Sequence, residues 1–178
     1  MNVRGRVLRA RGKLRRAQAL HENALTMHRK LQSEKRFAAA RAVAQNDLGL
    51  TLRRRGRPEA AEQEHRRALA DFRRLLPANH SFIGRALTGR ARALRAQWRY
   101  DDAERFYQQA IDHQRQALPD RHPRRADAVV GLGRLLLETG RGTEADSLLR
   151  RGLRLREQGL PAGHPAIAEV KQLLPASS

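Results

Sequence analysis

Histidine is the residue type whose spacing in this sequence most invites chemistry. Seven histidines occur among 178 residues, and His80, His122 and His164 follow one another at intervals of 42 residues. Imidazole is a common metal ligand. Residues at one place in successive structural repeats, however, lie about 10 Å apart or more, because a helix pair separates them. These histidines cannot share one ion, so we expect linker or helix-cap roles, with no metal and no cofactor.

Other patterns that could support catalysis are incomplete. The stretch GLGRLL contains Gly131 and Gly133, but no third glycine follows and no strand precedes it, although a phosphate-binding loop needs both. The sequence has no cysteine, which excludes disulfides, thiolate metal sites and cysteine nucleophiles. No serine lies in a recognisable catalytic motif. The sequence therefore predicts a protein that is not an enzyme.

Four aromatic residues gather within ten positions: Trp98, Tyr100, Phe106 and Tyr107. Aromatic side chains combine a large apolar surface with specific geometry, so such a group can form a ligand platform. The alternative is structural, and we favour it. Phe106 or Tyr107 is then expected to fill the core between repeats, and Tyr100 to brace a turn.

The composition predicts an all-α protein. Good helix formers dominate, and only 4% of the residues are aromatic, a class that strands favour. No apolar run approaches the roughly 18–20 residues of a membrane span. The N-terminal residues also lack the continuous apolar core of a secretory signal. We expect a cytoplasmic protein without membrane contact.

A period of 42 residues organises most of the chain. Ala61, Ala103 and Ala145 are separated by this interval, and a fixed period of 20–50 residues is the signature of a solenoid. Each unit contains two helical patterns joined by a turn. The turns are expected near Gly12, Gly56, Trp98 and Gly140. Because Trp98 replaces glycine, we expect its turn to lack a positive φ.

The third complete unit illustrates the predicted helices. His122-Pro123 opens the first helix, since proline suits a first turn, and Gly140 ends it. Thr143 is expected to cap the second helix. Paired helices approach closely only where the facing side chains are small. The small residues expected at these contacts are Gly49, Ala91 and Gly133 on the first helices and Ala61, Ala103 and Ala145 on the second.

Second helices also carry residues in a core stripe. His21 and His65 fall in this stripe, and we expect both to be packing residues.

The segment NDLGLTLRRRGRPEAAEQEHRRAL at 46–69 resembles a tetratricopeptide repeat. The marks of the family are Leu48-Gly49, the turn residue Gly56, and the alanines Ala61 and Ala68. The longer period and the His-Pro pairs resemble the kinesin-light-chain variant of the repeat, and the resemblance covers nearly the whole chain. It implies a right-handed α-solenoid of antiparallel helix pairs.

We expect one repeat domain over residues 1–178. Its units are predicted at about 1–32, 42–75, 84–117 and 126–159, with a terminal helix at about 164–174. The first unit is offset by 44 residues, so two extra residues lie between Leu25 and Asn46. It begins within its first helix and is expected to be truncated, whereas the terminal helix is expected to cap the array.

The resemblance implies a binding module whose first helices line a concave groove that holds an extended peptide. The small residues face the second helix, so the opposite face of each first helix is turned to the groove. The predicted groove residues are Arg6, Arg9, Asn46, Arg53, Arg85, Arg92, Arg95 and Arg134. Guanidinium groups pair with carboxylates through two hydrogen bonds, which favours an acidic peptide or protein segment as partner.

Some members of the superfamily hold a C-terminal carboxylate with lysine and asparagine. Asn46 matches the recurrent groove asparagine of the family, but Thr88 and Val130 stand at the equivalent places in the next two units. This departure favours an acidic segment over a carboxylate clamp.

The charge leaves alternatives open. The net charge is +19, and 33 of the 37 basic residues are arginine, a skew that a GC-rich genome produces without selection. If this skew alone explains the charge, the groove arginines are merely solvated. Nonspecific phosphate-driven binding of nucleic acid is a second alternative, and a sensor fragment of a larger regulator is a third. The second-helix arginines that would bind nucleic acid are Arg66, Arg67, Arg73, Arg74, Arg150, Arg151, Arg154 and Arg156.

Overall fold

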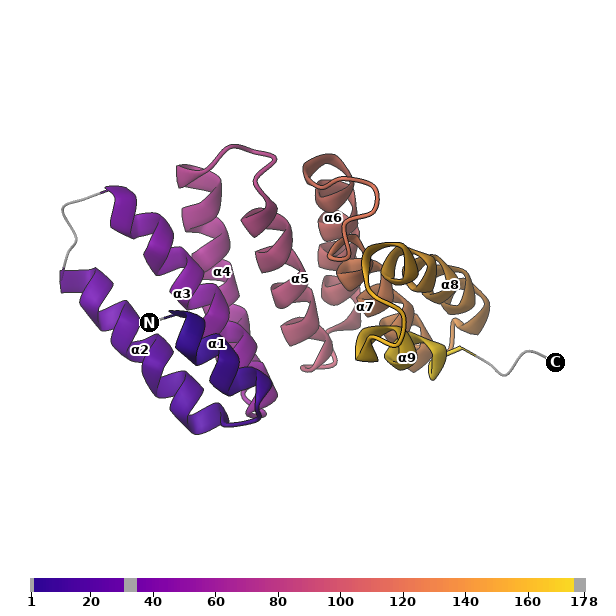
Figure 1. Ribbon diagram of the computed structural model, residues 1–178, viewed down its shortest axis with the longest axis horizontal. Helices are drawn as coiled ribbons and strands as arrows, with labels where there is room; N and C mark the ends of the chain where they lie inside the picture. The colour runs from indigo at the N-terminus through magenta and orange to yellow at the C-terminus, as the bar shows by residue number, and fades with distance from the viewer. Residues whose placement is uncertain (1, 31–34, 175–178) are drawn as a thin grey trace.

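The computed structural model describes residues 2–30 and 35–174, which form nine α-helices and no strand. The helices are α1 (Asn2–Ala10), α2 (Leu14–Lys30), α3 (Lys35–Arg54), α4 (Pro58–Leu75), α5 (Ser81–Arg95), α6 (Tyr100–Ala117), α7 (Arg125–Glu138), α8 (Gly142–Gly159) and α9 (Pro165–Lys171). Figure 1 shows them arrayed side by side along the long axis of the molecule. The predicted all-α solenoid is confirmed.

The helices pack as four successive pairs, α1 with α2, α3 with α4, α5 with α6, and α7 with α8. Each second helix also packs against the first helix of the following pair, and α9 packs against α8 (Figure 1). A single pair cannot bury both its apolar faces, so the stacking of pairs completes the core. Val170 of α9 is fully buried in this way at the end of the array.

The four turns within pairs share one hydrogen-bonding pattern. In the second pair, Gly56 N–H donates to the Arg53 carbonyl at 3.1 Å and Arg57 N–H to the Leu52 carbonyl at 3.0 Å. In these turns, a glycine two residues after the end of the first helix has a left-handed backbone, with φ of 73° at Gly12, 72° at Gly56 and 78° at Gly140. Glycine adopts this conformation without steric cost.

Trp98 adopts the same left-handed turn, with φ of 56°, so the expectation that its turn lacks a positive φ is wrong. The Trp98 and Arg99 amides donate to the Arg95 and Leu94 carbonyls at 3.0 and 3.1 Å, as in the glycine turns. The hydrogen bonds and the packing of the pair therefore determine the backbone here. The indole is 77% exposed, so little packing offsets the steric cost of a side chain in this region.

The histidines between pairs bond to the backbone two residues later. His80 Nδ1 accepts from Phe82 N–H at 3.2 Å, and His164 Nδ1 accepts from Ala166 N–H at 3.1 Å, each at a helix N-cap. His122 Nδ1 accepts from Arg124 N–H at 3.2 Å, although α7 begins only at Arg125. The predicted capping role is confirmed for His80 and His164, and the linker role for His122. The prediction that His122-Pro123 opens the helix is wrong, because Arg124 is the N-cap of α7.

Thr143 does not cap the second helix of its pair, and that prediction is wrong. Helix α8 begins at Gly142, with Arg141 at its N-cap and no side-chain hydrogen bond there. Arg57 and Arg99 hold the same N-cap place in α4 and α6. The shared turn therefore sets where each second helix begins, and Thr143 falls inside the first turn of its helix.

Small residues allow the close helix contacts, as predicted. A Cβ on Gly49 would lie 2.8 Å from His65 Nε2, and one on Gly133 would lie 2.9 Å from Leu149 Cγ. Ala103 is fully buried, as are its counterparts in the neighbouring pairs. His65 and Tyr107 are both fully buried between pairs, which confirms the packing roles predicted for them.

Candidate peptide-binding groove

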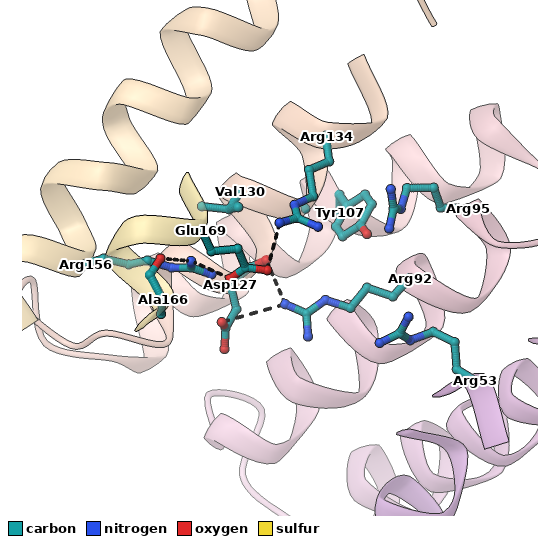
Figure 2. Close-up of a pocket in the computed structure, with 11 residues that line it drawn as sticks. Arg53, Arg92, Arg95, Tyr107, Asp127, Val130, Arg134, Arg156, Ala166 and Glu169 are labelled. Carbon is teal, nitrogen blue, oxygen red and sulfur yellow. Dashed lines mark hydrogen bonds and ion pairs between the residues drawn. The ribbon is translucent and has the colours of Figure 1, made fainter. Parts of the chain in front are cut away.

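A cavity of about 350 Å³ lies where first helices of the last repeats meet α9. We call it the arginine pocket. It is lined by Arg53, Arg92, Arg95, Tyr107, Asp127, Val130, Gly131, Arg134, Arg156, Ala166 and Glu169 (Figure 2). Helices α3, α5 and α7 supply most of these residues, α6 and α8 supply one each, and α9 closes one side.

A smaller cavity of about 80 Å³ adjoins the arginine pocket and shares Arg92 and Asp127 with it. Its other lining residues are Asn46, Leu50, Arg85, Thr88, Gly89, Gln114 and Arg124. Both cavities lie along the first helices, and we call the two together the basic groove.

Two ion pairs in the arginine pocket repeat one contact at successive positions. Arg92 Nη2 lies 3.7 Å from Asp127 Oδ1 and donates to the Asp127 carbonyl at 3.2 Å. Arg134, 42 residues after Arg92, donates to Glu169 Oε1 at 2.8 Å, and Glu169 likewise follows Asp127 by 42 residues. Both pairs link one first helix to the next (Figure 2).

Two further arginines complete the network. Arg156 donates to Glu169 Oε2 at 2.9 Å, so this carboxylate is shared by two guanidinium groups. Arg95 pairs with Glu138.

Arg53 differs from the other arginines of the pocket because no acidic residue neutralises it. Among the residues that the structure describes, its guanidinium has no ion pair, and its buried Nε has no acceptor. The repeat explains why. Arg95 stands 42 residues after Arg53 and pairs with Glu138, but Ala96 occupies the place equivalent to Glu138. Burial, with the positive charge of Arg92 as the next cause, lowers the pKa of Arg53 to about 10.

Comparison with known proteins identifies the family to which this helical repeat belongs. The family model described as "Tetratricopeptide repeat" matches residues 1–74, 41–116 and 82–158. The chain belongs to the tetratricopeptide repeat family. No curated protein matches the sequence significantly.

Solved structures share the fold of this tetratricopeptide repeat chain. The TPR-like repeats of a Podosopora anserina protein described as a kinesin light chain are 21% identical, with a TM-score of 0.73 over 97% of this chain and 81% of that one. BtubC (BKLC) from P. vanneervenii is 18% identical, with a TM-score of 0.74 over 93% of this chain and 65% of that one.

Most of the residues predicted to line a groove also line one of the two cavities. Arg53, Arg92, Arg95 and Arg134 line the arginine pocket, and Arg85 lines the smaller cavity. Arg85 Nη2 donates to Asp47 Oδ1 at 3.4 Å. Asn46 also lines the smaller cavity, whereas Arg6 and Arg9 lie elsewhere.

Asn46 reaches the smaller cavity, but it is only 2% exposed and its Oδ1 lies 3.0 Å from His65 Nδ1. Its Oδ1 is therefore engaged inside the protein. Arg6 and Arg9 line neither cavity. Arg6 is exposed on α1, and the Arg9 carbonyl accepts a hydrogen bond from Arg54 at 2.7 Å.

Four charged or polar side chains that line the arginine pocket were not among the predicted groove residues: Tyr107, Asp127, Arg156 and Glu169. Arg156 was grouped with the second-helix arginines that would bind nucleic acid, but it is 6% exposed and donates to Glu169 and to the Ala166 carbonyl. The position of Arg156 within the repeat could have predicted this burial. Gln114 and Phe72, which precede it by one and two repeats, are also buried.

Within the described ranges, no three His, Cys, Asp or Glu side chains are grouped as a metal site requires. None of the helices described has both the length and the apolar character needed to cross a membrane.

Proposed function

We propose that this chain is a scaffold that binds an acidic, extended segment of a partner protein in the basic groove. Tetratricopeptide repeats generally mediate interactions between proteins. The observation that supports an acidic partner is the charge of the arginine pocket, whose lining contains five arginines and only two carboxylates. We further infer a non-catalytic role in the cytoplasm, as family membership and the sequence favour.

The placement of these arginines argues against simple solvation. The side chains of Arg92, Arg95 and Arg134 are 29%, 19% and 31% exposed, so all three are largely withdrawn from water. Partly burying several like charges together is unfavourable unless counter-charges are near. The acids present leave an excess of positive charge, and the carboxylates of a bound segment would neutralise it.

The shape of the groove favours an extended chain. Successive residues of an extended peptide point to opposite sides, and each advances the chain by about 3.3 Å. Alternate side chains can therefore enter adjoining cavities, and the arginine pocket and the smaller cavity share a wall at Arg92. A segment with acidic residues at alternate positions fits this arrangement.

Nucleic acid is the less favoured ligand because several second-helix arginines are already paired. Arg67 donates to Glu64 at 2.6 Å, Arg74 to Asp71 at 3.1 Å and Arg150 to Asp146 at 2.8 Å. Arg156 is buried. Fewer unpaired cations are therefore presented on that face than the sequence predicts.

A binding comparison at two salt concentrations tests the proposal. The two probes are an extended acidic peptide and a single-stranded oligonucleotide of similar length and charge. We expect the peptide to bind more tightly and to retain measurable affinity at the higher salt concentration, whereas phosphate-driven binding falls steeply with salt. Binding of the oligonucleotide alone would refute the proposed function.

A further inference from the structure

The arginine pocket contains hydrogen-bond donors that the protein itself leaves unused. Tyr107 is fully buried, and its hydroxyl has no hydrogen-bond partner of good geometry among the residues that the structure describes. Arg95 lies beside this hydroxyl (Figure 2). A guanidinium carries only N–H donors, so Arg95 cannot accept the tyrosine proton.

The guanidinium groups add further donors to the same wall. The Nε atoms of Arg53 and Arg95 are buried and have no acceptor among the described residues. Buried donors without acceptors are rare in native proteins, and each one requires an explanation. A cavity with donors from Arg53, Arg95 and Tyr107 is suited to a ligand group that carries several acceptor oxygens.

The net charge of the arginine pocket indicates the charge expected on the ligand group. Asp127 and Glu169 balance two of the five lining arginines, and Glu138 pairs with Arg95 from outside the lining. The remaining excess is about two positive charges. A phosphate monoester carries about 1.5–2 negative charges near neutral pH and three acceptor oxygens, whereas a carboxylate carries one charge and two oxygens.

Gly131 gives the Tyr107 hydroxyl its place in the pocket wall. A Cβ at this position would lie 2.8 Å from Tyr107 Cζ and 3.0 Å from the hydroxyl oxygen. Any side chain here would displace the ring or cover its polar end. The glycine thus leaves the hydroxyl beside the cavity that both residues line.

We propose that the arginine pocket binds the phosphate monoester of a phosphorylated side chain in the partner segment, with Arg53, Arg95 and Tyr107 as its donors. Arg92 and Arg134 supply further positive charge around it. This inference rests on the proposed function, because the basic groove must hold the segment that carries the phosphate. It goes beyond that function because it places a dianionic phosphate, instead of a carboxylate, at one position of the bound segment.

Inorganic phosphate tests the pocket without a partner. At matched ionic strength, phosphate is expected to raise the Tm of the protein more than chloride does. Arg53→Gln and Tyr107→Phe should each lose most of this increase. Arg151→Gln is the control for Arg53→Gln, because it removes one charge from an exposed position on α8.

Tyr107→Phe separates a ligand role from a structural one. The variant keeps the buried ring and removes a hydroxyl without an acceptor, so its stability without phosphate should equal or exceed that of the wild type. A wild-type response to phosphate in Tyr107→Phe, or in Arg53→Gln, would overturn the proposal.

A pair of peptides distinguishes this inference from the proposed function. The peptides share one acidic extended sequence and differ at a single central residue, phosphoserine in one and glutamate in the other. We expect the phosphopeptide to bind at least about tenfold more tightly. Equal affinities would overturn the phosphate pocket and leave the acidic-segment function intact. Failure of both peptides to bind would overturn both.

Discussion

His65 and Tyr107 hold the same place in successive repeats, 42 residues apart, and yet they have different surroundings. Both rings are fully buried, and each faces a glycine of the following first helix, Gly89 over His65 and Gly131 over Tyr107. His65 Nδ1 lies 3.0 Å from Asn46 Oδ1. Tyr107 has no such partner within residues 2–30 and 35–174, and its polar end lies at the arginine pocket.

The comparison shows how one backbone position serves two purposes. At the first-helix place of Asn46, the next repeat has Thr88, whose hydroxyl donates to the Gly84 carbonyl at 2.9 Å. Tyrosine also extends farther from the backbone than histidine does. Among the described residues, the same packing thus pairs Nδ1 of His65 in one repeat and leaves the Tyr107 hydroxyl unpaired beside the groove in the next.

The first expected effect comes from filling the two glycines. In Gly89→Ala and Gly131→Ala the new Cβ would lie 2.7 Å from His65 Nδ1 and 2.8 Å from Tyr107 Cζ. Both rings are rigid and enclosed. Each variant should therefore lose about 1–3 kcal/mol of the free energy of unfolding, or somewhat more, in chemical denaturation.

Gly142→Ala is the matched control, because its Cβ would meet nothing within 4 Å. It should be as stable as the wild type or slightly more stable, since alanine is the better helix former. Wild-type stability in Gly89→Ala or Gly131→Ala would show that the rings do not fill the contact between repeats as described.

The second expected effect is a loss of stability at acidic pH, which His65 causes and Tyr107 does not. Burial, with the nearby charge of Arg53 as the next cause, lowers the pKa of His65 from 6.5 to about 3. Between these values the unfolded chain binds a proton that the native state does not. Stability contributed by neutral His65 is therefore complete above pH 6.5 and is lost as the pH falls toward 3, by roughly 1.4 kcal/mol per pH unit.

Denaturant unfolding between pH 4 and 6 measures this slope. His65→Leu should reduce it, because leucine cannot titrate and Leu149 already occupies the equivalent place two repeats later. Burial also lowers the pKa of His21, so part of the slope should remain. An unchanged slope in His65→Leu would contradict the assignment to His65.

The third and smallest effect concerns the turns of the two repeats. The repeat of His65 turns at Gly56, whereas the repeat of Tyr107 turns at Trp98 with the same left-handed backbone. Because left-handed backbone costs a non-glycine residue about 1–2 kcal/mol, partly offset by the flexibility of unfolded glycine, Trp98→Gly should gain up to about 1 kcal/mol. Gly56→Ala should lose a similar amount. Thermal unfolding of both variants would check this, and a loss of stability in Trp98→Gly would contradict it.

The fold was predictable because a few small residues recur in register. Gly49, Ala61 and their counterparts located the helix contacts, and the glycines located the turns. Trp98 and Thr143 were misjudged because a local preference was applied to one residue. The hydrogen bonds of the turn, common to all repeats, determine both the φ of Trp98 and the start of α8.

The candidate groove was predictable in part for the same reason. The face of each first helix located Arg53, Arg92, Arg95 and Arg134, which the structure brings to one cavity. Their acidic neighbours come from later helices, so only tertiary packing reveals which arginines are neutralised. Arg53 is left unpaired because Ala96 replaces the acid of the next repeat, a detail that depends on a contact between repeats.

The measurement that tests the central claim most directly is the affinity of an acidic peptide for two charge-reversed variants. One carries Arg92→Glu and Arg95→Glu in the arginine pocket, and the other carries Arg151→Glu and Arg154→Glu, which are exposed on α8. Both change the net charge equally, and circular dichroism first verifies that both are folded. We predict that the pocket variant loses about tenfold or more in affinity, because charge-assisted hydrogen bonds contribute about 1.5–3 kcal/mol each, while the α8 variant changes little. Equal losses in the two variants would show diffuse electrostatic attraction and contradict binding in the groove.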